Sequence, residues 1–157
     1  MNKTVYDFTL QDIKGNPFEL AQFKGKKILL VNTASACGLT PQYQQLEDLH
    51  QNYKDKLAII GLPCNDFGAQ EPGTETEILQ FCESKYQVTF PLTQKVKVLG
   101  SNQHPLYSFL THKAQNGHSD SEVKWNFQKY LIDENGQLIQ VFSPMVEPLS
   151  EELLNAL

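Results

Sequence analysis

Short blocks of apolar residues divide the chain into alternating strands and helices. Residues 28–32 and 57–62 are continuous apolar runs, which are typical of strands buried on both faces. Between these runs, apolar side chains recur at helical spacing from residue 43 to about residue 53. Thr40 can cap this helix, with Pro41 in its first turn. The order of strand, helix and strand predicts a parallel crossover.

The remaining pattern adds two hairpins and three helices. Residues 6–13 alternate loosely before a turn signal at 14–17, which predicts an N-terminal hairpin or extended arm. Thr74 and Glu77 form a capping-box pattern for a helix that extends to about residue 86. A second hairpin turns at Asn135-Gly136. The other expected elements are a helix at 104–112, a polar loop at 116–120, strands at 127–133 and 138–142, and a terminal helix at 148–157.

Together these elements predict an α/β protein with a thioredoxin-like fold. Parallel crossovers followed by a hairpin give a central mixed β-sheet with helices on both faces. The chain has 157 residues and 40% hydrophobic content, which suffice for one domain with its own core. No linker is visible, so we expect residues 1–157 to form a single domain.

Composition narrows the choice of partners and compartment. The net charge is -5 and all thirteen basic residues are lysines, which argues against nucleic acid as a partner. The N-terminus has no apolar signal core and no apolar run could span a bilayer, so we expect a cytoplasmic protein without stable membrane insertion. Three cysteines cannot form a closed set of structural disulfides, which raises the question of thiol chemistry.

Cys37 lies where reactive groups gather in α/β proteins. It follows a buried strand and precedes a helix start, at the carboxyl edge of the expected sheet. Free amides and the dipole at a helix N-terminus favour a thiolate over a thiol. The position therefore predicts a nucleophilic sulfur, although free cysteines also serve as small core residues.

Several other cysteine chemistries lack their sequence signatures. Thr40 stands where a dithiol oxidoreductase would carry its second cysteine, and the same absence of paired cysteines disfavours a binding module or metal chaperone. No compact cysteine and histidine pair has zinc-like spacing, so we expect neither a metal nor a cofactor. A cysteine-histidine hydrolase has no local signature here, but the sequence leaves it open.

Three segments, taken in order, resemble the glutathione peroxidase family: Asn-Thr-Ala-Ser-Ala-Cys-Gly-Leu-Thr at 32–40, Pro-Cys-Asn-Asp-Phe-Gly-Ala-Gln-Glu-Pro-Gly at 63–73, and Trp-Asn-Phe at 125–127. The resemblance extends over essentially the whole chain. It implies that Cys37 is the peroxidatic residue and that Gln70, Trp125 and Asn126 complete the site. Two primary amides and an indole N–H are uncharged donors that suit a thiolate and a departing oxygen anion.

The resemblance implies a thiol peroxidase that reduces hydrogen peroxide and organic or lipid hydroperoxides while Cys37 becomes a sulfenic acid. Cys82 resembles the resolving cysteine of the thioredoxin-dependent branch, which implies a disulfide between Cys37 and Cys82. Thioredoxin would reduce that disulfide, with glutathione as the alternative donor, and a monomer is implied. The rival interpretation is a peroxide sensor that passes its oxidation to a partner protein.

The position of Cys82 creates a geometric difficulty for that disulfide. Cys82 lies on the apolar side of the helix predicted to end near residue 86, where core packing is its ordinary role. A disulfide needs Cα atoms within about 7 Å of each other. We therefore expect oxidation to require unwinding around residues 81–86. Cys64 follows a strand, where packing is its ordinary role, and remains the alternative resolving thiol.

Overall fold

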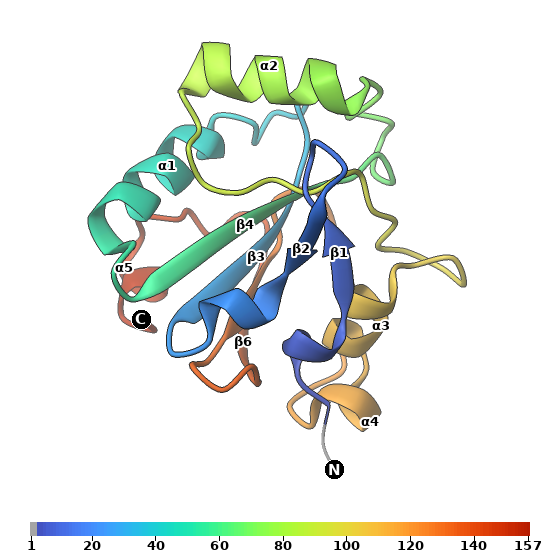
Figure 1. Ribbon diagram of the computed structural model, residues 1–157, viewed down its shortest axis with the longest axis vertical. Helices are drawn as coiled ribbons and strands as arrows, with labels where there is room; N and C mark the ends of the chain where they lie inside the picture. The colour runs from blue at the N-terminus through green and yellow to red at the C-terminus, as the bar shows by residue number, and fades with distance from the viewer. Residues whose placement is uncertain (1–2) are drawn as a thin grey trace.

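Four strands form the central sheet of the computed structural model, which describes residues 3–157 (Figure 1). Their order is β4-β3-β5-β6, with β3 parallel to β4 and antiparallel to β5, and β5 antiparallel to β6. The predicted mixed sheet is confirmed. The bounds are β3 Lys27–Thr33, β4 Leu57–Pro63, β5 Lys129–Ile132 and β6 Leu138–Phe142.

Helices cover both faces of this sheet because side chains alternate along its strands. Leu29 and Val31 of β3 face one apolar layer, while Ile28 and Leu30 face the other. The first layer contains residues of α1, α2 and α5, and the second contains residues of α3. The helices are α1 Gln42–Tyr53, α2 Glu75–Tyr86, α3 Pro105–Thr111, α4 Lys113–Asn116 and α5 Glu151–Leu154. Within residues 3–157, no helix is long and apolar enough to cross a membrane.

The N-terminal hairpin has the expected form, whereas the expected polar loop and terminal helix differ from the structure. The N-terminal hairpin is confirmed as β1 Thr9–Gln11 and β2 Pro17–Glu19, with 3-10 turns at Val5–Asp7 and Leu20–Phe23 beside it. Helix α4 replaces part of the expected polar loop, because the buried Asn116 side chain donates to the Phe109 and Leu110 carbonyls. Helix α5 stops at Leu154.

Strand β5 begins later than the sequence pattern predicts. Phe127 has a φ of +68°, in the left-handed region, so the extended backbone cannot start there.

The capping box of α2 is confirmed, since Glu77 N donates to Thr74 Oγ1 at 3.2 Å and Thr74 N donates to Glu77 Oε1 at 2.9 Å. This helix therefore has a firmly defined start.

Lys129 is a lysine buried inside the fold. Its Nζ donates to Gln42 Oε1 at 2.6 Å and to the carbonyls of Pro144 at 3.1 Å and Val146 at 2.6 Å. These bonds tie β5 to the start of α1 and to the segment after β6. Burial lowers the pKa of Lys129 to about 7, against a smaller opposing effect of the Glu147 carboxylate.

The depressed pKa predicts a pH-dependent contribution to stability. Between pH 7 and about 10, the unfolded chain binds more protons at Lys129 than the folded chain does, so the free energy of unfolding rises with pH. In Lys129→Met this contribution vanishes. The slope of the free energy of unfolding against pH should therefore be smaller in the variant than in wild type, by up to about 1.4 kcal/mol per pH unit. Urea unfolding at several pH values measures both slopes. Equal slopes would show that Lys129 keeps an ordinary pKa.

Candidate active site

Cys37 lies in a turn between β3 and α1. The Leu39 amide donates to Cys37 Sγ at 3.3 Å, and Cys37 is 9% exposed. Its backbone N–H donates to Thr40 Oγ1 at 2.9 Å, and that hydroxyl donates to the Ala34 carbonyl at 2.9 Å. The expectation that Thr40 caps α1 is therefore wrong, because its hydroxyl is used within the Cys37 turn. Helix α1 begins at Gln42, and the nearest amide donor to the sulfur belongs to the turn.

Gln70 joins the three segments that carry the expected site residues. The Ala36 amide, next to Cys37, donates to the Gln70 carbonyl at 3.0 Å. The Asn126 side chain donates from Nδ2 to Gln70 Oε1, also at 3.0 Å, and Asn126 is fully buried. Segments separated by more than thirty residues in sequence thus meet at one glutamine.

Trp125 lies over the loop that carries Gln70. Its ring centroid is 5.5 Å from that of Phe67, and the residue is 37% exposed. Gly68 has a φ of +64°, and a Cβ there would lie 3.2 Å from Trp125 Cη2 and 3.4 Å from Gln70 Cγ. Glycine therefore supplies both the backbone angle and the space that place the indole beside Gln70.

Asn32 and two strained residues complete the framework, and none of these roles was expected from the sequence. The Asn32 side chain donates to the Trp125 carbonyl at 3.1 Å, and the backbone carbonyl of Asn32 accepts from Phe127 N at 2.6 Å. Ala69 and Phe127, which adjoin Gln70 and Asn126, have left-handed φ angles of 51° and 68°. Strained backbone of this kind often accompanies functional sites. Only Asn32's position at the end of an apolar run could have signalled its role.

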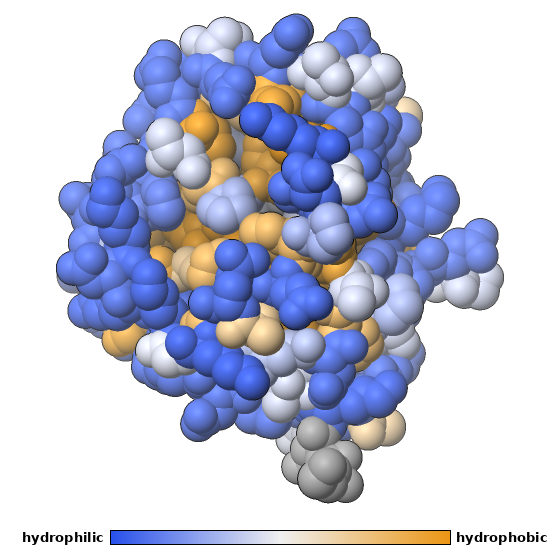
Figure 2. All heavy atoms as spheres, in the orientation of Figure 1, coloured by the Kyte–Doolittle hydropathy of each residue, from blue (hydrophilic) through white to orange (hydrophobic). Residues whose placement is uncertain are grey.

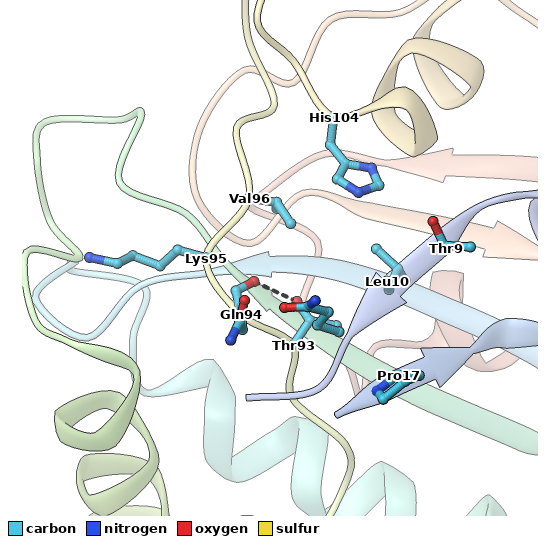
Figure 3. A pocket seen from close by; sticks show the side chains of 9 residues that line it. Thr9, Leu10, Pro17, Thr93, Gln94, Lys95, Val96 and His104 are labelled. Carbon is cyan, nitrogen blue, oxygen red and sulfur yellow. Dashed lines mark hydrogen bonds between the residues drawn. The ribbon is translucent and has the colours of Figure 1, made fainter. Parts of the chain in front are cut away.

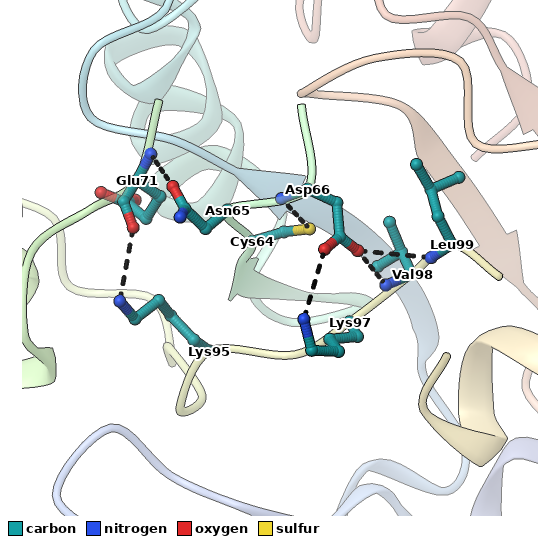
Figure 4. A network of polar contacts seen from close by, with 8 residues as sticks. All are labelled: Cys64, Asn65, Asp66, Glu71, Lys95, Lys97, Val98 and Leu99. Atoms are coloured by element: carbon teal, nitrogen blue, oxygen red, sulfur yellow. Dashed lines mark hydrogen bonds and ion pairs between the residues drawn. The ribbon is translucent and has the colours of Figure 1, made fainter. Parts of the chain in front are cut away.

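The loop of Gln70 is fixed from its other side by a polar network (Figure 4). Asp66 accepts from the amides of Val98 at 2.6 Å and Leu99 at 3.3 Å. Asn65 Oδ1 accepts from Glu71 N at 2.8 Å, and the Asp66 amide donates to Cys64 Sγ at 3.4 Å. The Cys64 sulfur is thus part of the loop's own structure. Among residues 3–157, no three histidine, cysteine, aspartate or glutamate side chains form a group that could hold a metal.

The sheet separates one of the three cysteines from the other two. Cys37 and Cys82 belong to the layer of α1 and α2, whereas Cys64 belongs to the layer of α3. All three are free thiols, and Cys64 and Cys82 are fully buried. Burial raises the pKa of Cys64 to about 12 and that of Cys82 to about 11.

Two surface hollows lie away from these residues. A pocket of about 440 Å³ lies between the N-terminal hairpin and residues 93–96, with His104 at its rim (Figure 3). Another, of about 420 Å³, separates the Leu79 side of α2 from that hairpin. Figure 2 shows apolar residues exposed within hollows of a mostly polar face. Cys37, Gln70, Trp125 and Asn126 line neither pocket, so the candidate site lies outside both hollows.

Comparison with known proteins places the chain in a family. The family model described as glutathione peroxidase matches residues 5–111. The chain is 49% identical over 147 residues to "Glutathione peroxidase homolog BsaA" of Staphylococcus epidermidis. This match covers 93% of this chain and 92% of that protein. It is 45% identical over 151 residues to "Glutathione peroxidase-like peroxiredoxin 2" of Saccharomyces cerevisiae, and this match covers 96% of this chain and 93% of that protein.

Solved structures give the same result at the level of fold. The crystal structure of Trgpx in apo form matches with a TM-score of 0.75 and 34% identity, covering 99% of this chain and 96% of that one. A thioredoxin family protein from Chlorobium tepidum matches with a TM-score of 0.68 and 14% identity, covering 99% and 96%, which shows the fold alone. The molecule is a thiol peroxidase on a thioredoxin-like fold. The chain belongs to the glutathione peroxidase family.

Burial predicts unequal reactivity of the three thiols. In the native protein near neutral pH, iodoacetamide should alkylate Cys37 at least about tenfold faster than Cys64 or Cys82, because the latter two are buried and have raised pKa values. Peptide mass spectrometry over a time course measures the three rates. Urea-unfolded protein is the control, in which the rates should converge. Comparable native rates would contradict the burial argument.

Proposed function

We propose that Cys37 is the peroxidatic nucleophile, assisted by Gln70, Trp125 and Asn126. The thiolate sulfur attacks one peroxide oxygen, the O–O bond breaks, and Cys37 becomes a sulfenic acid. The sulfur is oxidised, and the departing alkoxide or hydroxide takes up a proton to leave as alcohol or water. The observation that carries this proposal is the meeting of Ala36, Gln70 and Asn126 through two hydrogen bonds of 3.0 Å.

The bond between Asn126 and Gln70 also orients the glutamine. Because Asn126 Nδ2 donates to Gln70 Oε1, the Gln70 NH₂ group remains as a donor for an anion. Trp125 adds an indole N–H at a half-buried position beside the same loop. Fixed neutral donors can stabilise the thiolate and the developing charge on oxygen without reorganising during the reaction.

Removal of one donor should slow the oxidation of Cys37. Gln70→Leu is expected to lower the second-order rate constant for hydrogen peroxide by on the order of 10², the effect typical of one oxyanion donor. Stopped-flow measurement of sulfenic acid formation tests this, with Gln22→Leu, an exposed glutamine, as the control. Cys37→Ser should abolish turnover. An unchanged rate in Gln70→Leu would remove the proposed role of the amide.

We propose Cys82 as the resolving cysteine. Its thiol attacks the Cys37 sulfenic acid, the S–O bond breaks, and a disulfide and water form. Cys82 shares an apolar layer with Cys37, and no strand of the sheet separates the two residues. Cys64 lies in the opposite layer and has the higher pKa. The layer assignment therefore favours Cys82 over Cys64.

Helix α2 can release Cys82 at modest cost. Ile78 and Cys82 are its buried residues, and a pocket lies beside the helix at Leu79 and Glu83. The helix ends at Tyr86 and is followed by Gln87, which has a φ of +49°; the Cys82 carbonyl accepts from the amides of both Gln87 and Val88. Loss of the last turn would free Cys82 and relieve a left-handed residue. We expect the Cys37–Cys82 disulfide to form with this unwinding.

Disulfide mapping separates the two resolving candidates. After one equivalent of peroxide, mass spectrometry should find Cys37 joined to Cys82, with the same yield in Cys64→Ser. In Cys82→Ser, Cys37 should remain as a sulfenic acid that reacts with dimedone. Amide exchange of residues 81–86 should be faster in oxidised than in reduced protein. A disulfide between Cys37 and Cys64, or equal exchange in both states, would contradict this assignment.

Thioredoxin is the proposed reductant. A dithiol reductant can reduce an internal disulfide in two successive exchanges and become a disulfide itself, and the chain contains no arginine for bidentate binding of the glutathione carboxylates. The name of the yeast relative, a peroxiredoxin, agrees with a thiol-based cycle. We further propose a monomer in the cytoplasm. Steady-state turnover with thioredoxin compared with glutathione tests the choice of donor.

A further inference from the structure

Gln128 is a buried glutamine between Asn126 and β5 that the proposed chemistry does not use. The residue is 2% exposed. Its Oε1 accepts from the Lys124 amide at 2.9 Å, and its Nε2 donates to the Glu122 carbonyl at 2.8 Å and to the Tyr130 hydroxyl at 3.0 Å. A primary amide has two donor hydrogens and one carbonyl oxygen, so both ends of this side chain are engaged in holding its neighbours.

The bonds of Gln128 hold a segment that has no regular structure of its own. Residues 117–128, from the end of α4 to the start of β5, belong to no helix or strand. The Gln128 side chain binds the backbone at residues 122 and 124, so it closes a loop around Trp125. Its third partner, the Tyr130 hydroxyl, lies 2.9 Å from Ser121 Oγ, and Tyr130 is fully buried in β5. The loop is therefore fixed to the central sheet.

Trp125 is the proposed site residue that depends most on these bonds. Asn126 is fully buried and has its own hydrogen bond to Gln70. The Trp125 backbone is held on one side through its carbonyl, which accepts from Asn32, and on the other side through the Lys124 amide. The indole is 37% exposed, so packing constrains it less than it constrains a core side chain. The direction of the indole N–H therefore follows from the backbone that carries it.

We propose that Gln128 is a positioning residue that orients the Trp125 indole and so sets the rate at which peroxide oxidises Cys37. The inference rests on the proposed role of Trp125 as a donor to the reacting atoms. The three hydrogen bonds of Gln128 go to the loop and to β5, so it acts through Trp125 and not on the substrate. A donor that is fixed before the reaction stabilises the developing charge without reorganising, and misplacement by about 1 Å can lower a rate about a hundredfold.

Gln128→Met tests this inference because it keeps the length of the side chain and removes all three hydrogen bonds. The second-order rate constant for sulfenic acid formation, measured by stopped flow, should fall by about ten- to a hundredfold. Asn116→Leu is the matched control: Asn116 is 4% exposed, and its side chain likewise binds nearby backbone, at the Phe109 and Leu110 carbonyls. The control should unfold at lower urea concentration than wild type but keep the wild-type rate constant.

A double-mutant cycle distinguishes positioning from a general loss of stability. In a Trp125→Phe background, Gln128→Met should change the rate constant by no more than about twofold, because the group through which Gln128 acts is already absent. A merely structural role would lower the rate constant by the same factor in both backgrounds.

Two further measurements keep the test independent of this one variant. Trp125 is the only tryptophan of the chain, so its fluorescence reports its surroundings without turnover. Emission should shift to longer wavelength in Gln128→Met and stay unchanged in Asn116→Leu. Tyr130→Phe keeps the ring and removes one of the three bonds, so it carries the test if Gln128→Met does not fold. It should lower the rate constant by about two- to tenfold.

The outcomes separate this inference from the proposed function. A wild-type rate constant in both Gln128→Met and Tyr130→Phe, or an equal loss in both backgrounds of the cycle, would overturn the inference alone. If Trp125→Phe by itself leaves the rate constant unchanged, the proposed role of Trp125 fails first.

Discussion

The hydrogen bonds at Gln70 hold the candidate site together. Its backbone carbonyl receives the Ala36 amide and its side chain receives the Asn126 amide, so one residue connects the turn of Cys37 with the segment of Trp125. Both bonds join segments far apart in sequence, and each requires the sheet to bring its strand ends to one edge. The left-handed angles of Ala69 and Phe127 show the backbone strain that accompanies this arrangement.

The sheet also divides the cysteines between its two faces. Alternating side chains create two apolar layers, and the layer that a cysteine joins decides which thiol it can meet. Cys37 and Cys82 share a layer, while Cys64 is held in the other by its own loop. Burial raises the pKa of Cys64 and of Cys82, which agrees with the proposed role of Cys37 as the thiol that peroxide oxidises first.

Two buried polar groups in this molecule cost stability and lie where they can fix the position of neighbouring segments. Lys129 is held by three oxygen acceptors, one at the start of α1 and two in the segment after β6, and Tyr43 keeps an unpartnered hydroxyl in the first turn of α1. An apolar residue would avoid the desolvation of either group. Both groups lie near the edge of the sheet that carries the candidate site. Their position agrees with a role in orienting neighbouring segments rather than in stabilising the fold.

The sequence by itself determined the elements whose signals are local: the buried strands β3 and β4, the capping box at Thr74 and the turn at Gly136. Its motif residues also indicated the family. Tertiary structure alone decided that Thr40 serves the Cys37 turn instead of capping α1, that Phe127 is left-handed, and that Cys64 and Cys82 lie in opposite layers. These outcomes depend on partners distant along the chain, whereas propensity and spacing report only on near neighbours.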